Sequence, residues 1–262
     1  MRVDQALREV RARGRPALVP YVLVDRARRA RTPAVAQMLK AAGATALELG
    51  FPFSDPIADG PVLEAASDRA LKDGTHWSDL IASLRAVSTI LPSAVMTYAN
   101  PVWRHGLTTA LRELSDAGAS ALIIPDLSLE DSGPWERAAR AEGISFVLLA
   151  APGASADRVT RLARRSRGFL YLVSRYGTTG AGSGTAASDL GGIVRLVHRT
   201  APRLPVLVGF GIRDRASVTE ALAVGADGVI VGSALEERLA RGESLKAVGR
   251  WVGSLLPQAR GT

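Results

Sequence analysis

The sequence predicts an α/β fold in which eight parallel strands close into a single (β/α)8 barrel. Short, nearly continuous apolar runs alternate with helix-period segments from end to end, and such runs are typical of parallel strands covered on both faces. The phrase Ala-Gly-Ala recurs at 42–44, 117–119 and 224–226, each time just before a strand. No linker divides the 262 residues, a length that one barrel domain commonly uses. A doubly wound open sheet is the weaker alternative.

Eight apolar runs account for the strands of this barrel. They are expected at Leu18–Val24, Ala46–Phe51, Ala94–Asn100, Ala121–Asp126, Ile144–Ala150, Phe169–Ser174, Pro205–Gly211 and Gly228–Ala234. The barrel should occupy about residues 18–256, after an N-terminal helix of about residues 2–13.

Helical periodicity fills the segments between the strands. Clear examples are Thr32–Ala42, Val62–Asp73, Leu107–Ala117, Leu129–Glu142 and Arg215–Val224. Each is followed by or ends next to a glycine of the kind that terminates helices, namely Gly43, Gly74, Gly118, Gly143 and Gly225.

Composition excludes several classes of chemistry. The chain has no cysteine, so disulfides, thiolate metal sites and Cys nucleophiles are absent. Its three histidines form no close pair, which disfavours a catalytic zinc, and we expect no metal. Its three lysines lie in helical segments, which disfavours a Schiff base. No apolar leader and no apolar run of about 20 residues is present, so we expect a cytoplasmic chain without a membrane partner.

The net charge of +8 raises the question of nucleic-acid binding. Arginines cluster at 26, 28, 29 and 31 and again at 161, 164, 165 and 167. No aromatic residues interleave these clusters and no nucleic-acid module is visible, so we expect solvated basic faces and no nucleic-acid partner.

The most informative stretch runs from Leu47 to Pro61 and reads LELGFPFSDPIADGP. It begins as an apolar strand that contains Glu48 and continues in a Pro-rich loop that carries Asp55 and Asp59. Burying an ionised Glu is costly, so the pKa of Glu48 should rise, whereas Asp59 in its polar loop should stay ionised. Two carboxyls whose pKa values are pushed apart suit acid/base catalysis. A purely structural Glu48, satisfied by an Arg or a backbone N–H, is the alternative.

The chemistry of a (β/α)8 barrel lies at the carboxyl ends of its strands and in the loops that follow. Besides Glu48 and the Asp55/Asp59 loop, this rule places on that face Asn100, Asp126, Tyr171, Arg175 and the Gly-rich segment 177–184. Glycines also end the seventh and eighth strands, where backbone N–H groups and a helix N-terminus commonly bind phosphate. Together these residues predict a lyase or isomerase that uses carboxylate acid/base catalysis on a phosphorylated small molecule.

The stretch from Leu47 to Pro61 closely resembles the signature of the tryptophan synthase α subunit family. Further motifs of that family follow in order: Tyr98–Val102, Pro125–Leu127, Tyr171–Arg175, Thr179–Ala181, Gly209–Ile212 and Gly232–Ala234. The resemblance covers nearly the whole chain. It implies a carbon–carbon lyase of the retro-aldol type that cleaves indole-3-glycerol phosphate to indole and glyceraldehyde 3-phosphate in tryptophan biosynthesis.

The resemblance also assigns roles to residues. It implies that Glu48 protonates indole C3, that Asp59 holds the indole N–H and stabilises the developing iminium charge, and that Tyr171 lies beside Glu48. We expect Tyr21, Phe210 and Leu49 near the indole, with ordinary barrel filling as the alternative. The complete predicted substrate and phosphate site comprises Tyr21, Arg175, Thr179, Gly180, Gly209, Phe210, Gly211, Gly232 and Ser233.

A partner is implied as well. In the family the α chain docks on a β subunit that holds pyridoxal phosphate, so we expect an α2β2 heterotetramer and no cofactor in this chain. The loop 53–56 and the Asn100-Pro101 turn should make that contact. The chain departs from the family pattern at Leu23–Ala27, at Ser128 and in the loop 180–184. A free-standing indole-releasing lyase and a non-catalytic regulatory or binding subunit therefore stay open as alternatives.

Overall fold

The computed structural model describes residues 1–174 and 185–257, and only the backbone of residues 185–189. Its eight strands form a closed barrel in chain order, and every strand pairs in parallel with its neighbours, including the first with the last. The strands are β1 (Ala17–Leu23), β2 (Leu47–Gly50), β3 (Ser93–Met96), β4 (Ala119–Ile123), β5 (Ser145–Ala150), β6 (Leu170–Val173), β7 (Val206–Gly209) and β8 (Gly228–Val231). The predicted (β/α)8 barrel is confirmed, and closure excludes the open sheet.

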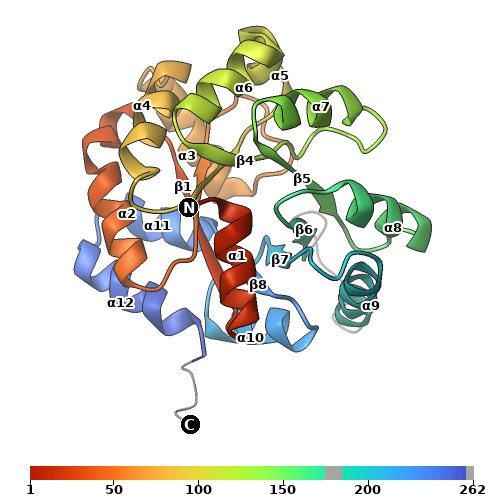
Figure 1. Ribbon diagram of the computed structural model, residues 1–262. Coiled ribbons are helices and arrows are strands. Elements are labelled where there is room, and N and C mark those ends of the chain that lie inside the picture. Colours follow the sequence, from red (N-terminus) through yellow and green to blue (C-terminus); the bar gives the residue numbers. More distant parts are fainter. Residues whose placement is uncertain (175–184, 258–262) are drawn as a thin grey trace.

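Helices surround this barrel (Figure 1). They are α1 (Val3–Ala12), the 3-10 helix η1 (Arg26–Arg31), α2 (Thr32–Ala41), α3 (Pro61–Lys72), α4 (Trp77–Val87), α5 (Ala99–His105), α6 (Leu107–Asp116), α7 (Gly133–Ala141), α8 (Ala156–Arg165), α9 (Thr185–Thr200), α10 (Arg215–Ala223), α11 (Ser233–Ala240) and α12 (Leu245–Leu255). Among the described residues, no helix is both long and apolar enough to cross a membrane.

The five glycines predicted to end helices do so in the left-handed conformation. Their φ angles lie between +69° and +101° at Gly43, Gly74, Gly118, Gly143 and Gly225. Only a residue without a Cβ reaches this region at little cost, and the turn it makes redirects the chain toward the next strand. The repeated helix-to-strand turn read from the sequence is therefore a real element of the barrel.

Most predicted bounds differ from the observed ones by only a few residues, and the differences are largest in two elements. The strand expected at Ala94–Asn100 ends at Met96, and Ala99 begins helix α5 because the carboxylate of Asp126 accepts its backbone N–H at 3.0 Å. The helix expected from Leu129 begins at Gly133. The side chain of Ser128 accepts the backbone N–H of Asp131 and holds a turn there. The substitution noted at Ser128 thus shapes the entry into α7.

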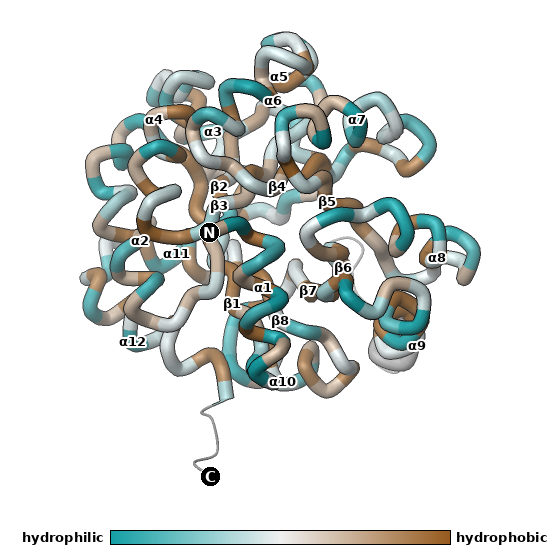
Figure 2. Tube along the Cα trace, viewed as in Figure 1, coloured by the Kyte–Doolittle hydropathy of each residue, from teal (hydrophilic) through white to brown (hydrophobic). Residues whose placement is uncertain are grey.

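Strand alternation divides the apolar residues into two layers. In β2, Leu47 and Leu49 belong to the layer between barrel and helices, whereas Ala46 belongs to the barrel interior. Because side chains alternate along a strand, Glu48 points into the interior with Ala46. The expectation that Leu49 packs near the substrate is therefore wrong. Hydrophobic stretches concentrate on the strands and on the helix sides that face them (Figure 2).

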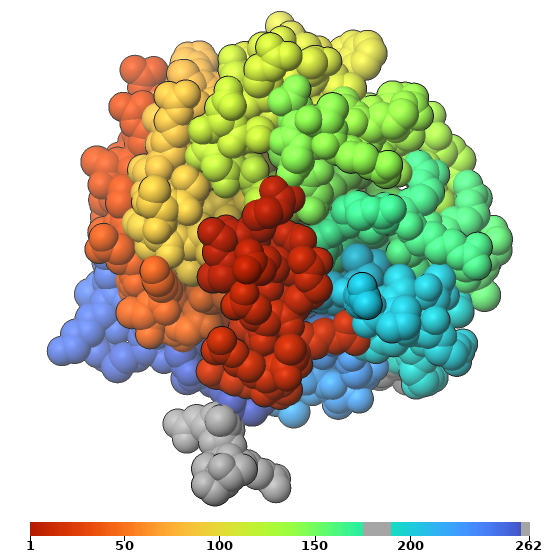
Figure 3. Space-filling model, viewed as in Figure 1, coloured from red at the N-terminus to blue at the C-terminus, as the bar shows by residue number. Residues whose placement is uncertain are grey.

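Helix α1 covers the amino-terminal end of the barrel. Val3 and Leu7 are fully buried and join the interior layer, and the backbone N–H of Val3 donates to the hydroxyl of Ser120 at 2.9 Å. The N-terminal segment accordingly lies across the middle of this face of the molecule (Figure 3). The opposite end, where the strands finish, is left for the candidate active site.

Candidate active site

Glu48 is a buried carboxyl group without a partner. Glu48 is 1% exposed, and neither of its carboxyl oxygens forms a hydrogen bond with another described atom. Burial raises the pKa of Glu48 to about 8, and the nearby charge of Asp59 raises it further in the same direction. The expected rise in pKa is present, and the structural alternative, in which an Arg or a backbone N–H satisfies Glu48, is absent from the described residues. At neutral pH this carboxyl is mostly a neutral acid.

Asp59 lies in the loop between β2 and α3. Burial raises its pKa to about 6, the hydrogen bond from the Tyr98 hydroxyl opposes that rise, and the Glu64 carboxylate in the first turn of α3 adds to it. The same tyrosine hydroxyl accepts the backbone N–H of Ala58 at 3.2 Å and so ties the loop to the end of β3. The pKa of Asp59 is thus higher than the sequence indicated, but it is lower than the pKa of Glu48. Asp59 therefore remains mostly ionised at pH 7.

Two tyrosines complete the interior of the site. Tyr21 of β1 pairs with Glu48 in the strand register, and Tyr171 projects from β6. Both are almost fully buried. Burial and the charges of Glu48 and Asp59 raise the pKa of both phenols, so both stay neutral hydrogen-bond donors. Tyr21 and Tyr171 belong to the same interior layer of the barrel, into which Glu48 also points.

Glycines make room for these tyrosines. A Cβ at Gly50 would overlap the phenol of Tyr21, and a Cβ at Gly209 would overlap that of Tyr171. Gly209 leaves room for the Tyr171 ring, and its expected contact with phosphate stays a prediction. Any side chain at either glycine would displace a tyrosine from the carboxyls.

The end of β7 carries an unusual backbone. Phe210 has a φ of +63° and Gly211 a φ of +77°. A left-handed non-glycine residue costs roughly 1–3 kcal/mol and often marks a functional site. The hydroxyl of Ser174 donates to the carbonyl oxygen of Phe210 and holds this turn. The ring of Phe210 lies 5.6 Å from that of Tyr171, centroid to centroid, and closes one side of the site.

The end of β8 leads directly into helix α11. Gly232 precedes the helix, and the exposed Ser233 is its first residue. The first N–H groups of a helix have no acceptors within it, and together with the helix dipole they favour an anion. A Cβ at Gly232 would approach the Cβ of Tyr21 at 3.5 Å, so this end of the site adjoins the tyrosine.

Glu236 was not anticipated from the sequence. It is 2% exposed, and its carboxylate accepts the backbone N–H of Leu23, the last residue of β1, at 2.7 Å. Arg28 of η1 lies 3.6 Å from the other carboxylate oxygen. Burial raises the pKa of Glu236 to about 7, whereas the Leu23 hydrogen bond and Arg28 lower it. The carboxylate thus anchors α11 to β1, and no local sequence pattern indicated it.

The segment Leu23–Ala27, which departs from the family pattern, contacts Glu236 and its neighbours. Asp25 is buried and accepts the backbone N–H of Ala27 at 2.8 Å, which starts η1. Its carboxylate also lies 3.4 Å from Arg28 and 4.0 Å from Arg69 of α3. Two of the four arginines of the first cluster are therefore engaged in ion pairs: Arg28 with Asp25 and Glu236, and Arg29 with Asp79.

The remaining predicted residues lie either outside the described residues or in and around helix α5. Arg175, Thr179 and Gly180 lie outside the described residues. Asn100 lies in helix α5, and Asp126 caps that helix through Ala99. Among residues 1–174 and 185–257, no three His, Cys, Asp or Glu side chains gather in a way that could hold a metal ion.

Comparison with known proteins agrees with this geometry. Residues 7–250 match the family model described as "Tryptophan synthase alpha chain". The chain belongs to the tryptophan synthase alpha chain family. It is 41% identical to the tryptophan synthase alpha chain of Synechococcus sp. (strain CC9902), over 99% of this chain and 95% of that one. It is 36% identical to that of Methanosarcina mazei, over 98% and 95% of the two chains.

Solved structures of tryptophan synthase alpha chains share the fold. A chain of tryptophan synthase from Mycobacterium tuberculosis in its aminoacrylate-bound form superposes with a TM-score of 0.84 and 32% identity, covering 97% of this chain and 98% of that one. The tryptophan synthase A-subunit of Pyrococcus furiosus gives a TM-score of 0.81 and 34% identity, covering 91% and 97%.

The raised pKa of Glu48 predicts a pH-dependent stability. Between about pH 4.5 and 8 the folded chain holds a proton on Glu48 that the unfolded chain has released, so the free energy of unfolding falls as pH rises through this window. Each pKa unit of the difference corresponds to about 1.4 kcal/mol. Glu48→Gln removes this dependence, and its stability relative to the native chain, measured by urea unfolding, is expected to be higher at pH 9 than at pH 5.

Glu220→Gln, at an exposed position on α10, is the matched control and should show the same difference at both pH values. A Glu48→Gln variant whose relative stability is also equal at pH 5 and pH 9 would contradict a neutral Glu48 in the folded chain.

Proposed function

We propose that this chain cleaves indole-3-glycerol phosphate to indole and glyceraldehyde 3-phosphate, as the alpha subunit of tryptophan synthase. One observation carries the proposal. A buried carboxyl that is neutral at pH 7, Glu48, shares the carboxyl end of the barrel with a carboxylate that is mostly ionised, Asp59. Such a pair supplies a proton donor and a fixed negative charge at the same pH.

The first step is transfer of a proton from Glu48 to indole C3. A neutral acid with a pKa near 8 is matched to this task at neutral pH. Asp59 accepts a hydrogen bond from the indole N–H and stabilises the positive charge that spreads to this nitrogen. Its partial burial strengthens that interaction, because water screens the charge less there.

The second step breaks the carbon–carbon bond. A base takes the proton of the glycerol hydroxyl next to the ring, the carbonyl of glyceraldehyde 3-phosphate forms, and the bonding pair returns to the indole ring. Glu48, which became a carboxylate in the first step, has two oxygens without partners among the described residues and is suited to accept this proton. The neutral Tyr171 hydroxyl lies near both carboxyls and helps to orient the substrate.

The phosphate of the substrate belongs at the ends of β7 and β8. Gly211, Gly232 and Ser233 lie there, and helix α11 directs its amino terminus toward the site. Tyr21 and Phe210 line the space between this end and the carboxyls, where an indole ring would stack. Arg175, Thr179 and Gly180 remain proposed substrate residues on the strength of the family resemblance.

The partner proposed for this chain is a tryptophan synthase beta subunit, in an α2β2 assembly in the cytoplasm. Ile57 and Trp103 are large apolar residues that are 80% and 68% exposed. They follow neighbouring strands at the active end, where Phe53 also stacks on Tyr98 with ring centroids 5.1 Å apart. Large apolar side chains exposed at one end of the barrel suit a contact with another protein. Pyridoxal phosphate belongs to the beta subunit, and this chain needs no cofactor.

The relatives are named as chains of a synthase, which favours a subunit over a free-standing lyase. The intact pair of carboxyls and the buried tyrosines favour a catalyst over a regulatory subunit.

Removing either carboxyl is expected to abolish indole release. Glu48→Gln cannot donate the proton to C3, and Asp59→Ala cannot stabilise the charge on nitrogen, so turnover of indole-3-glycerol phosphate should fall at least a thousandfold in each case. Indole is measured by a colorimetric assay and folding by circular dichroism.

Asp116→Asn and Glu220→Gln, which change exposed carboxyls on α6 and α10, are the controls and should keep full activity. Turnover at the native rate in a folded Glu48→Gln or Asp59→Ala variant would refute the proposed mechanism.

The docking surface is tested by adding a beta subunit from the same source. Indole release should be slow alone and rise strongly with the beta subunit. In the double variant Ile57→Ser/Trp103→Ser, turnover alone should be unchanged while the stimulation falls at least tenfold, because the apolar contact is lost. Fast turnover that the beta subunit does not affect would indicate a free-standing lyase instead. Full stimulation of the double variant would place the contact elsewhere.

A further inference from the structure

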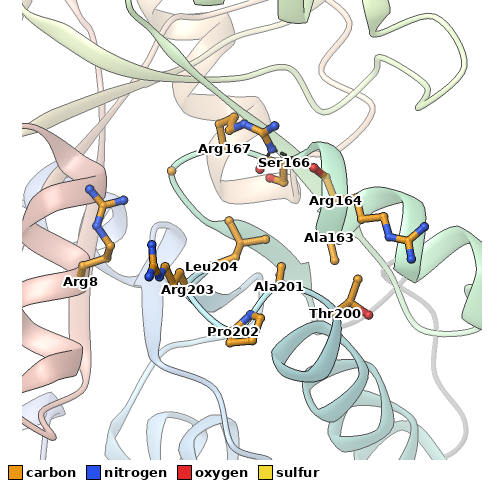
Figure 4. A pocket seen from close by; sticks show the side chains of 11 residues that line it. Arg8, Ala163, Arg164, Ser166, Arg167, Thr200, Ala201, Pro202, Arg203 and Leu204 are labelled. Carbon is orange, nitrogen blue, oxygen red and sulfur yellow. Dashed lines mark hydrogen bonds between the residues drawn. The ribbon is translucent and has the colours of Figure 1, made fainter.

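A basic cavity lies at the end of the barrel opposite the active site. Its volume is about 520 Å³, and its lining includes Arg8, Arg164, Arg167 and Arg203 (Figure 4). These arginines come from α1, from α8 and the loop that follows it, and from the loop between α9 and β7. The loops 166–168 and 200–204 precede β6 and β7, so the cavity opens at the amino-terminal end of the strands. The proposed reaction uses none of its residues.

The arginines at 161, 164, 165 and 167 fall into two groups, those paired with a carboxylate and those that line the cavity. Arg161 lies 3.4 Å from Glu130, and Arg165 lies 2.6 Å from Glu136, so both are neutralised by carboxylates. Arg164 and Arg167, on the cavity side, have no carboxylate partner among the described residues.

The charges around the cavity are correspondingly uncompensated. Arg203 also lacks a carboxylate partner within residues 1–174 and 185–257, and only Arg8 has one, Asp4 at 2.8 Å. The Nη1 group of Arg167 donates to the carbonyl oxygens of Arg164, Arg165 and Ser166, which fixes the guanidinium group at the end of α8 and leaves its other N–H groups for an anion. No acidic residue is among those lining the cavity. Like charges held around one concavity raise its affinity for anions.

The cavity is open to solvent and combines apolar and basic groups. Ala163, Ala201, Pro202 and Leu204 form an apolar floor between the arginines (Figure 4). The volume lies in the range of small-molecule sites. No aromatic side chain lines the cavity, so it offers no surface on which nucleic-acid bases could stack. This lining disfavours a nucleic acid as the ligand. Guanidinium groups bind phosphate oxygens in bidentate fashion, which suits a ligand with several phosphate charges.

We infer that this cavity binds a small polyphosphorylated anion, at a site separate from the active site. Because bound anion offsets the repulsion among the arginines, binding should also stabilise the folded chain.

The test uses inorganic tripolyphosphate as probe on the full chain. Isothermal titration at 50 mM NaCl should show binding that weakens as salt rises. The double variant Arg164→Gln/Arg203→Gln should lose at least tenfold in affinity, whereas Arg85→Gln/Arg250→Gln, which removes the same charge from exposed positions away from the cavity, should bind as the native chain does. Tripolyphosphate should also protect Arg164 and Arg203, but not Arg85, from modification by phenylglyoxal.

Four results would overturn the inference. They are no binding by the native chain, equal loss of affinity in both double variants, protection confined to arginines outside the cavity, and tighter binding of a single-stranded RNA 12-mer that only the cavity variant loses. The last result would identify a nucleic-acid interface. Indole release should be unchanged in both double variants, so this test is independent of the proposed reaction.

Discussion

The buried carboxyl group of Glu48 is the constraint on which the rest of the site depends. Strand alternation turns it into the barrel interior, where neither oxygen has a partner among the described atoms. An ionised carboxylate in that position would cost several kcal/mol, so the group stays neutral at pH 7 and its pKa rises to about 8. A partner such as an arginine would have stabilised the fold, but it would also have lowered the pKa of Glu48 and left no proton to donate at pH 7. The apolar layers of the barrel offset this cost.

The surrounding structure keeps the groups that work with Glu48 in place. Tyr98 holds the loop of Asp59 through the backbone of Ala58. On the other side, Glu236 ties the start of the proposed phosphate helix α11 to the end of β1. Asp25, Arg28 and Arg69 connect this anchor to α3, the helix that begins just after Asp59. The Asp59 loop and the start of α11 are therefore connected through one set of hydrogen bonds and ion pairs.

Much of this arrangement could be predicted from the sequence because it depends on local signals. Apolar runs, the glycines after helices and a lone acid in a strand all act within a few residues, and they gave the barrel, its order and Glu48. Features that depend on distant partners could not be predicted. Nothing near Glu236 indicates that it will meet Leu23, and the four arginines at 161–167 look alike until Glu130 and Glu136 neutralise two of them. A strand buried on both faces shows no polar alternation, so its apolar pattern does not reveal that Leu49 faces the helices while Glu48 faces the interior.

The most direct test of the central claim is the pH dependence of kcat/KM for indole release by the native chain. A neutral Glu48 and an ionised Asp59 are both required, so the profile should be bell-shaped. It should fall below about pH 6 as Asp59 is protonated and above about pH 8 as Glu48 ionises. A profile that is flat from pH 6 to 9, or that rises through pH 8, would contradict an acid role for Glu48.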